Sequence, residues 1–173
     1  MDIKLIGTDI DGVWTDAKMY YTEKGDFMKA FSTYDGMAIQ ILKDLKIPVI
    51  ILTSEKTNIV LERAKKLGID EVYINEKEKL KRMTYICKKL NISMNKVAYI
   101  GDDLNDLELL KKVGISGCPI NSPIKNLFEP DIITNKIGGE GAFREFVDKI
   151  LNPDPLSKFI DSLIKWILFI YFI

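Results

Sequence analysis

Two aspartates near the N-terminus, Asp9 and Asp11, are separated by one residue and are followed by Gly12. In an extended chain, side chains two residues apart point the same way, so these carboxylates would lie close together. Carboxylates held close repel each other unless a cation neutralises them or one of them is protonated. A third carboxylate, Asp102, follows Gly101. Because such a set offers only oxygen ligands, we predict a Mg²⁺ ion held by Asp9, Asp11 and Asp102.

An aspartate carboxylate beside a magnesium ion can attack phosphorus and form an aspartyl-phosphate. We expect Asp9 to be the nucleophile, and Asp11 to act first as general acid toward the leaving oxygen and then as general base for water. Thr53 can donate a hydrogen bond to a phosphate oxygen, and Lys79 can add positive charge to the transition state. The chain has no histidine, so carboxylates must carry the acid-base chemistry.

Two further carboxylates, Asp103 and Asp106, directly follow this cluster. One of them would support Lys79 or order metal-bound water from behind the metal ligands. The alternative is a helix N-terminus, where acidic side chains are favoured in any case. Both descriptions can hold at once.

Short apolar runs alternate with helical patterns along the chain, which predicts a three-layer, doubly wound parallel α/β sheet. The expected strands are 4–8, 48–52, 71–74 and 97–100, with weaker candidates at 115–117 and 131–133, and the expected helices are 35–45, 56–67, 77–90, 105–113 and 142–151. Asp9, Thr53 and Asp102 each come just after a predicted strand. Ligands of such sheets bind beyond the carboxyl ends of the strands, so three strands would deliver these groups to one edge.

The segment 17–31 interrupts this alternation, because aromatic and β-prone residues flank a turn at 23–26. We predict a β-hairpin inserted after the first strand. The hairpin would either cover an edge of the sheet or project as a flap. In the second case Tyr20, Tyr21 and Phe27 would be exposed and would mediate self-association.

The composition is that of an ordinary globular protein, with 173 residues, 47% of them hydrophobic and 29% charged. Lys and Arg total 25, as do Asp and Glu, so the formal net charge is zero and no basic field attracts nucleic acid. Cys87 and Cys118 form neither a metal-ligand spacing nor a CxxC pair, which argues against a zinc site. The N-terminus lacks the pattern of a signal peptide, so we expect a cytoplasmic location.

The motifs 9–13 (DIDGV), Thr53, Lys79 and 101–106 (GDDLND) occur in an order that resembles the four motifs of the haloacid dehalogenase (HAD) superfamily of phosphatases. No segment of the chain is long enough for a cap domain. The resemblance implies a magnesium-dependent phosphoric monoester hydrolase.

Two alternatives come from other functional classes. A receiver domain would carry its nucleophile on a later strand than Asp9 does, and the complete set of motifs argues against a catalytically inactive assembly subunit.

The hairpin and the segments 31–36 and 138–145 resemble the capless branch that contains 3-deoxy-D-manno-octulosonate 8-phosphate (KDO 8-phosphate) phosphatase. The similarity runs over about residues 4–163. Members of that branch form homotetramers in which the flap hairpins build a central barrel and a neighbouring subunit helps to close each site. The resemblance therefore implies a small phosphorylated sugar acid as substrate and a homotetramer built through the flap.

Within this branch, residues 53–57 (TSEKT) together with Arg63 and Lys66 are similar to the nonulosonate 9-phosphate phosphatases. Those enzymes act on 2-keto-3-deoxynononate or N-acylneuraminate 9-phosphate, whereas octulosonate enzymes more often carry Arg where Glu55 stands. The resemblance makes Ser54, Glu55, Arg63 and Lys66 candidates for substrate binding. Arg63 and Lys66 share a helix face and could hold a substrate carboxylate, or they could be an ordinary solvated surface.

The predicted reaction is hydrolysis of a 2-keto-3-deoxy sugar acid phosphate through an aspartyl-phosphate, with the nine-carbon substrate favoured. KDO 8-phosphate hydrolysis and a general sugar phosphatase activity are the alternatives. The predicted phosphatase domain is 1–151, followed by a tail at 152–173 whose last eight residues, 166–173, are all apolar. A membrane-spanning helix needs about 20 apolar residues, so we expect this tail to pack on protein rather than to contact a membrane.

Overall fold

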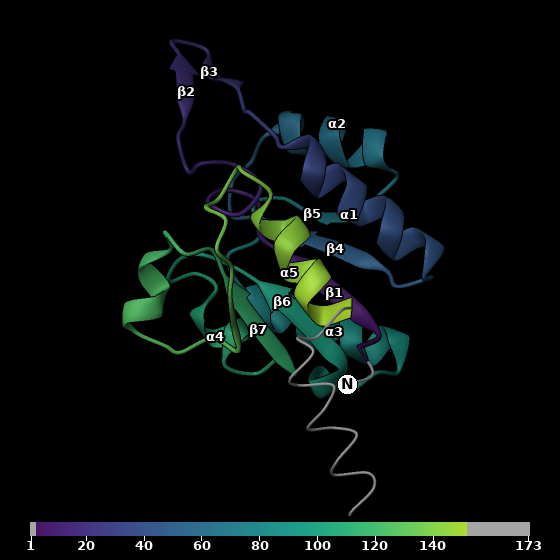
Figure 1. Ribbon diagram of the computed structural model, residues 1–173. Helices are drawn as coiled ribbons and strands as arrows, with labels where there is room; N and C mark the ends of the chain where they lie inside the picture. The colour runs from purple at the N-terminus through teal and green to yellow at the C-terminus, as the bar shows by residue number, and fades with distance from the viewer. Residues whose placement is uncertain (1–2, 152–173) are drawn as a thin grey trace, which may run out of the picture.

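The computed structural model describes residues 3–151 of the chain. Six parallel strands form one sheet in the order β5-β4-β1-β6-β7-β8, and helices cover both of its faces (Figure 1). The strands are β1 (Leu5–Thr8), β4 (Val49–Leu52), β5 (Glu71–Tyr73), β6 (Val97–Ile100), β7 (Ile115–Cys118) and β8 (Ile132–Ile133). This architecture confirms the predicted doubly wound α/β fold, and the described residues contain no cap domain.

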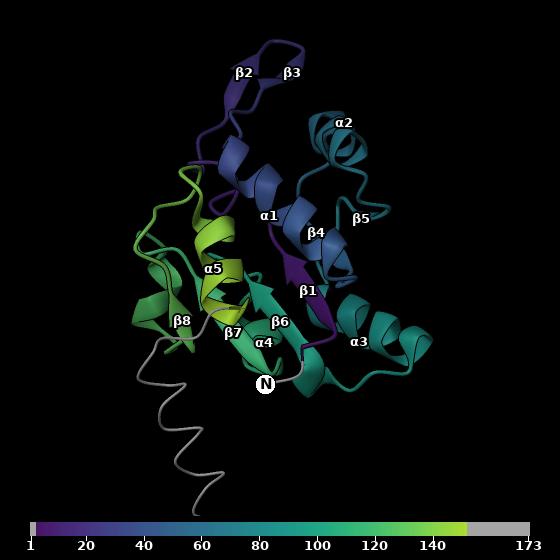
Figure 2. The ribbon, with the colours of Figure 1, turned by 45° about the vertical axis from the view of Figure 1, so that its right-hand side comes forward.

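Within residues 3–151, five α-helices accompany the sheet, namely α1 (Thr33–Asp44), α2 (Asn58–Leu67), α3 (Lys79–Leu90), α4 (Leu107–Leu110) and α5 (Ala142–Leu151). Successive residues of β1 point to opposite faces, so Ile6 packs with α1, α2 and α5, whereas Leu5 packs with α3 and α4. Figure 2 shows α1 and α5 together on one side of the sheet. Both faces are therefore apolar, as a parallel sheet requires.

The start of α1 and both ends of α4 are among the helix boundaries that differ from the prediction, and local hydrogen bonds explain them. Helix α1 begins at Thr33, earlier than expected, because the Ser32 side chain caps it and accepts a hydrogen bond from the Tyr34 N–H at 3.2 Å. Helix α4 covers only Leu107–Leu110, whereas 105–113 was predicted. The residues before it form a loop in which the backbone N–H groups of Asp102 and Asp103 donate to the Asp106 carboxylate.

The inserted hairpin consists of β2 (Tyr20–Thr22) and β3 (Gly25–Met28), which pair only with each other. It projects from the body of the protein, so it does not cover an edge of the main sheet (Figure 1). Tyr21 and Phe27 are 61% and 66% exposed. Of the two alternatives for the hairpin, the structure therefore has the projecting flap.

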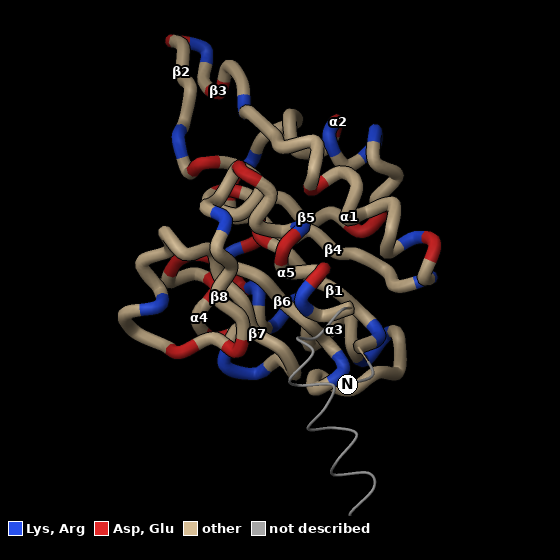
Figure 3. The backbone as a smooth tube through the Cα atoms, viewed as in Figure 1, with Lys and Arg blue, Asp and Glu red and all other residues tan. Residues whose placement is uncertain are grey.

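Acidic and basic residues are interspersed along the described backbone, in keeping with the zero net charge (Figure 3). Between residues 3 and 151, none of the helices combines the length and the hydrophobicity needed to cross a bilayer. The predicted apolar tail at 152–173 lies outside the described residues.

Candidate active site

Three neighbouring strands, β4, β1 and β6, end at the same edge of the sheet. Thr53 follows β4, Asp9 follows β1, and Asp102 follows β6 after one glycine. A cavity of about 400 Å³ opens at this edge, and its lining includes all three of these residues. The predicted convergence of the strand ends is therefore present in the structure, because parallel neighbours place their carboxyl ends side by side.

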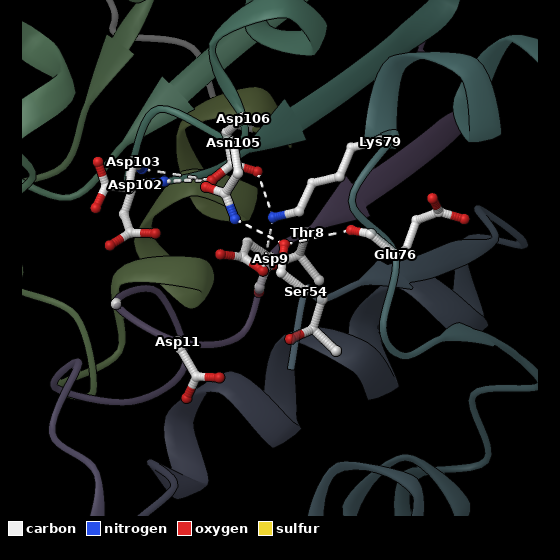
Figure 4. A network of polar contacts seen from close by, with 12 residues as sticks. Thr8, Asp9, Asp11, Ser54, Glu76, Lys79, Asp102, Asp103, Asn105 and Asp106 are labelled. Atoms are coloured by element: carbon white, nitrogen blue, oxygen red, sulfur yellow. Dashed lines mark hydrogen bonds and ion pairs between the residues drawn. The ribbon is translucent and has the colours of Figure 1, made fainter. Parts of the chain in front are cut away.

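Lys79 is the first residue of α3, and its fully buried ammonium group lies beside Asp9 (Figure 4). Its Nζ is 2.9 Å from Asp9 Oδ1 and 2.7 Å from Asp106 Oδ1. Burial by itself would lower the pKa of Lys79, but the neighbouring Asp9 and Asp106 carboxylates outweigh it and raise that pKa. Lys79 is therefore a permanent positive charge next to Asp9.

Asp106 uses both carboxylate oxygens to hold its surroundings in place. Its Oδ1 accepts from Lys79 and from the Tyr99 hydroxyl at 2.5 Å, and its Oδ2 accepts from the backbone N–H groups of Asp102 and Asp103. Asp103 instead accepts a bond from the Leu104 N–H at 2.7 Å, on the cavity wall. Of the two candidates for supporting Lys79, the structure places Asp106 against it.

Carboxylate oxygens of Asp9, Asp102 and Asp106 lie within 4.8 Å of one another. Burial raises the pKa of Asp102 to about 9, with the charge of Asp9 as the next contribution, and burial together with Asp106 raises the pKa of Asp9 to about 7. A divalent cation would relieve this repulsion, and an all-oxygen donor set suits Mg²⁺. Since both Asp106 oxygens are already bonded within the protein, Asp9 and Asp102 are the side chains that fit the ion.

The Asp11 carboxylate points away from this cluster, so the side chain of this predicted metal ligand does not join those of Asp9 and Asp102 in the structure (Figure 4). Its Oδ1 lies 2.5 Å from Lys29 Nζ and accepts from Thr15 Oγ1 at 3.3 Å. The strand alternation on which the prediction relied ends at Thr8, and the Ile10 carbonyl then accepts three backbone bonds that curl the chain into a turn. Asp11 still lines the cavity.

Two glycines allow the backbone segments around Asp9 to approach each other. Gly12 has φ +94°, and a Cβ there would lie 1.9 Å from Asp102 Oδ2. A Cβ on Gly138 would lie 1.9 Å from the Gly12 carbonyl oxygen. The neighbouring Gly139 N–H donates to the Val13 carbonyl at 3.1 Å. The loop before α5 is thus a direct backbone support for the loop that carries Asp9 and Asp11.

The opposite wall of the cavity is formed by the residues after β4. Thr53 is buried, and its Oγ1 accepts from the Glu55 N–H at 3.3 Å, which leaves the hydroxyl hydrogen available to a phosphate oxygen. Ser54 Oγ donates to the Glu76 carbonyl at 3.3 Å and accepts from Asn105 Nδ2 at 2.9 Å. Ser54 and Glu55, the two residues of this segment that were predicted to contact substrate, both line the cavity.

Arg63 and Lys66 do not line the cavity of their own chain. The Arg63 guanidinium lies over the Phe31 ring, with its carbon 5.5 Å from the ring centroid, and Nη2 donates to the Ser32 carbonyl at 3.2 Å. Lys66 is exposed on the same helix. Within one chain these two positions therefore differ from the predicted substrate contacts, because α2 carries them away from the strand ends.

Sequence reasoning did not find Lys29 or Asn105 as site residues. Asn105 belongs to the GDDLND run, so its position beside Asp102 was a usable signal. Lys29 is 18 residues from Asp11 on the far leg of the hairpin, and no local pattern connects the two. Lys29 and Asp11 come together because the hairpin returns the chain to the active site.

Residues 25–114 match the family model described as haloacid dehalogenase-like hydrolase. The 3-deoxy-D-manno-octulosonate 8-phosphate phosphatase KdsC of Haemophilus influenzae is 34% identical over 161 residues, which cover 93% of this chain and 89% of that protein. The KdsC protein of Escherichia coli K12 is 35% identical over 150 residues, which cover 87% of this chain and 80% of its own length.

Solved structures agree with these relatives. The KDO 8-phosphate phosphatase of Moraxella catarrhalis, crystallised with magnesium, phosphate and KDO, has a TM-score of 0.83 at 36% identity, with 94% of each chain covered. The corresponding phosphatase of Yersinia pestis has a TM-score of 0.82 at 35% identity, covering 87% of this chain and 81% of its own.

Proposed function

Because the chain belongs to the haloacid dehalogenase-like hydrolases, in the family of the KDO 8-phosphate phosphatases, we propose that it hydrolyses KDO 8-phosphate. It is a phosphoric monoester hydrolase that uses Mg²⁺. The observation that carries the proposed reaction is the meeting of Asp9, Thr53, Lys79 and Asp102 at one edge of the sheet. The names of the relatives described above support the choice of substrate.

In the first half-reaction a carboxylate oxygen of Asp9 attacks phosphorus, and the bond between phosphorus and the sugar oxygen breaks. Asp11 gives a proton to that leaving oxygen. In the second half-reaction Asp11 takes a proton from water, the water oxygen attacks phosphorus, and Asp9 is released with inorganic phosphate. Thr53 holds a phosphate oxygen through its hydroxyl, and Lys79 balances the charge beside Asp9 throughout.

Bound Mg²⁺ supplies positive charge that offsets the repulsion between the Asp9 carboxylate and the phosphate. Asp9 and Asp102 would hold it, since their oxygens are close together and not otherwise saturated. Asp106 would keep Asp102 and Lys79 in register through its four hydrogen bonds. Gly12 leaves the space that Asp102 occupies.

A nine-carbon sugar acid 9-phosphate is the second candidate substrate, and Glu55 is the observation that favours it. Glu55 lines the cavity, at a position where octulosonate enzymes more often carry Arg. A carboxylate there would accept hydrogen bonds from sugar hydroxyls instead of attracting the substrate carboxylate. The relatives described above, in contrast, are named for the eight-carbon substrate, and for this reason it is the primary proposal.

The deciding measurement is kcat/KM for both sugar acid phosphates with saturating Mg²⁺, with glucose 6-phosphate as the simple sugar phosphate. We expect KDO 8-phosphate to be preferred over glucose 6-phosphate by about 100-fold or more, the scale that specific polar contacts can supply. A preference for the nine-carbon substrate would replace the primary proposal by the second candidate. Equal rates for all three would indicate a general sugar phosphatase.

A neighbouring subunit would complete the site in the proposed homotetramer. The projecting hairpin, with exposed Tyr21 and Phe27, supports self-association through the flap. Arg63 and Lys66 are outside the cavity of one chain, so they could hold a substrate carboxylate only from another copy.

A further inference from the structure

Lys29 follows β3 and forms the base of the second leg of the hairpin. Its side chain is only 1% exposed, and its Nζ lies 2.5 Å from Asp11 Oδ1. This ammonium also contacts the Met19 sulfur at 3.4 Å, on the first leg. A buried ammonium is unfavourable without a charged partner, so this contact with Asp11 is required for Lys29 to occupy that position.

The two oxygens of Asp11 have different surroundings. Oδ1 is held by Lys29 and by the Thr15 hydroxyl, whereas Oδ2 is buried and has no hydrogen-bond partner in the structure. A carboxylate tethered through one oxygen has a restricted rotation, so Lys29 and Thr15 fix the orientation of Asp11 beside the cavity that it lines. General acids act only when they lie within hydrogen-bond distance of the leaving oxygen, so this restriction bears directly on the reaction.

We propose that Lys29 is a positioning residue that holds Asp11 through Oδ1 and so fixes the orientation of its carboxyl group beside the cavity. This inference rests on the proposed role of Asp11 as general acid and base. Ala17 and Met19, on the other leg of the hairpin, line the same cavity. The base of the flap is thus part of the catalytic arrangement, and the hairpin links the surface for self-association to the acid-base group.

The chain offers a matched control at the same end of the hairpin. Lys18 also pairs with an aspartate, with its Nζ 2.8 Å from Asp16 Oδ2. That pair is exposed, with 72% of the Lys18 side chain accessible, and it is not part of the cavity lining. Lys18→Met therefore removes the same type of charge and ion pair without removing the tether on Asp11.

The test compares two leaving groups in the first turnover, measured by rapid mixing of the full-length enzyme with Mg²⁺. The oxygen of an alkyl phosphate such as a sugar acid phosphate must be protonated as it leaves, whereas 4-nitrophenolate leaves without a proton. We expect Lys29→Met to slow the first turnover of the sugar phosphate by about 30-fold or more, with KM nearly unchanged. The burst of 4-nitrophenol should stay within about threefold of wild type.

Lys29→Arg should recover part of the sugar phosphate rate, and Lys18→Met should match wild type. Equal losses for both leaving groups, or a loss confined to KM, would overturn the positioning role. Lys29→Gln, judged by the same comparison, replaces the methionine variant if the latter does not fold. Asp11→Asn separates the two proposals: if it keeps the wild-type first turnover with the sugar phosphate, the proposed role of Asp11 is wrong whatever the Lys29 variants do.

Discussion

At the scale of single residues, the chemistry depends on charges that the fold brings together against their mutual repulsion. Asp9 is buried between Lys79 and two other carboxylates, so its charge is balanced on one side and opposed on the other. Burial raises its pKa to about 7. A buried carboxylate in this position costs stability, and such shifted pKa values are common among catalytic residues.

Asp9→Asn should abolish hydrolysis, by about 1,000-fold or more, because an amide cannot form the phosphoenzyme. The fold should stay intact and its melting temperature should not fall, since the substitution removes a charge from a repulsive cluster. Turnover assays and circular dichroism melting check the two parts. Wild-type turnover in this variant would contradict the assignment of Asp9 as nucleophile.

Asp35 is a second buried carboxylate, and it lies outside the active site. Its Oδ1 accepts from the Arg144 N–H at 2.9 Å at the start of α5, and Oδ2 has no hydrogen-bond partner. Burial raises its pKa from 3.8 to about 7, while the Arg144 and Phe143 backbone bonds and the charge of Arg63 act in the opposite direction. The folded state therefore binds a proton more tightly than the unfolded state does.

For a carboxyl group whose pKa rises on folding, stability is greatest at low pH and is lost as pH rises toward the folded pKa. Between pH 4 and pH 8 the free energy of unfolding of wild type should fall, relative to that of Asp35→Asn, by roughly 3 kcal/mol. Denaturant unfolding of both proteins across this range gives the difference. Asp44→Asn, at an exposed position of the same helix, serves as the control and should show no such trend.

At the scale of elements, the loop before α5 supports the catalytic loop through backbone contacts that only glycine allows. Gly138→Ala would place a methyl group 1.9 Å from the Gly12 carbonyl oxygen, so one of the two loops must move. We expect a loss of about 1–3 kcal/mol in stability and about 10-fold or more in kcat. Chemical denaturation and turnover assays measure the two effects.

Gly25→Ala provides the comparison for this prediction. Gly25 has a positive φ of +103°, but a Cβ there would meet nothing within 4 Å, and the residue is the first of β3, directly after the hairpin turn. It should therefore show backbone strain of about 1 kcal/mol without the loss in kcat. Equal activity of the two variants would contradict the supporting role of the loop before α5.

At the scale of the whole molecule, the ends of β1 and β6 bring the proposed ligands Asp9 and Asp102 together, so a bound metal should stabilise this arrangement. We expect saturating Mg²⁺ to raise the melting temperature by several degrees and EDTA to reverse the gain, because an ion that binds only the folded state shifts the folding equilibrium. Asp102→Asn should lose most of this gain. Melting curves with and without Mg²⁺ test this, and an equal gain in the variant would contradict Asp102 as a ligand.

The projecting flap leads to a prediction about assembly. Tyr21→Ser combined with Phe27→Ser removes two large side chains that are 61% and 66% exposed in one chain. If the proposed tetramer forms through the hairpins, this variant should dissociate to smaller species, because apolar area is what such an interface buries. Size-exclusion chromatography with light scattering measures the mass. Tyr85→Ser, an exposed aromatic on α3, is the control and should leave the mass unchanged.

The sequence by itself was sufficient to predict the parallel sheet and the positions of Asp9, Thr53 and Asp102 at one edge of it. This succeeded because a residue that directly follows a buried parallel strand is placed by the strand, whatever the loops do. Lys79 was predicted as the positive charge, and its ion pair with Asp9 is present in the structure. The ends of α1 and α4 were less accurate, because capping and loop hydrogen bonds decide them.

Only the tertiary structure decided where Asp11, Arg63 and Lys29 point. Beyond Thr8 the side chains no longer alternate as they do in a strand. The turn after Ile10 directs the Asp11 carboxylate toward Lys29 and away from the carboxylates of the proposed metal site. Arg63 has the residue type of a carboxylate ligand, but α2 places it over Phe31. Lys29 and Asp11 are 18 residues apart, with both strands of the hairpin between them. At that separation the sequence does not indicate which way either side chain points.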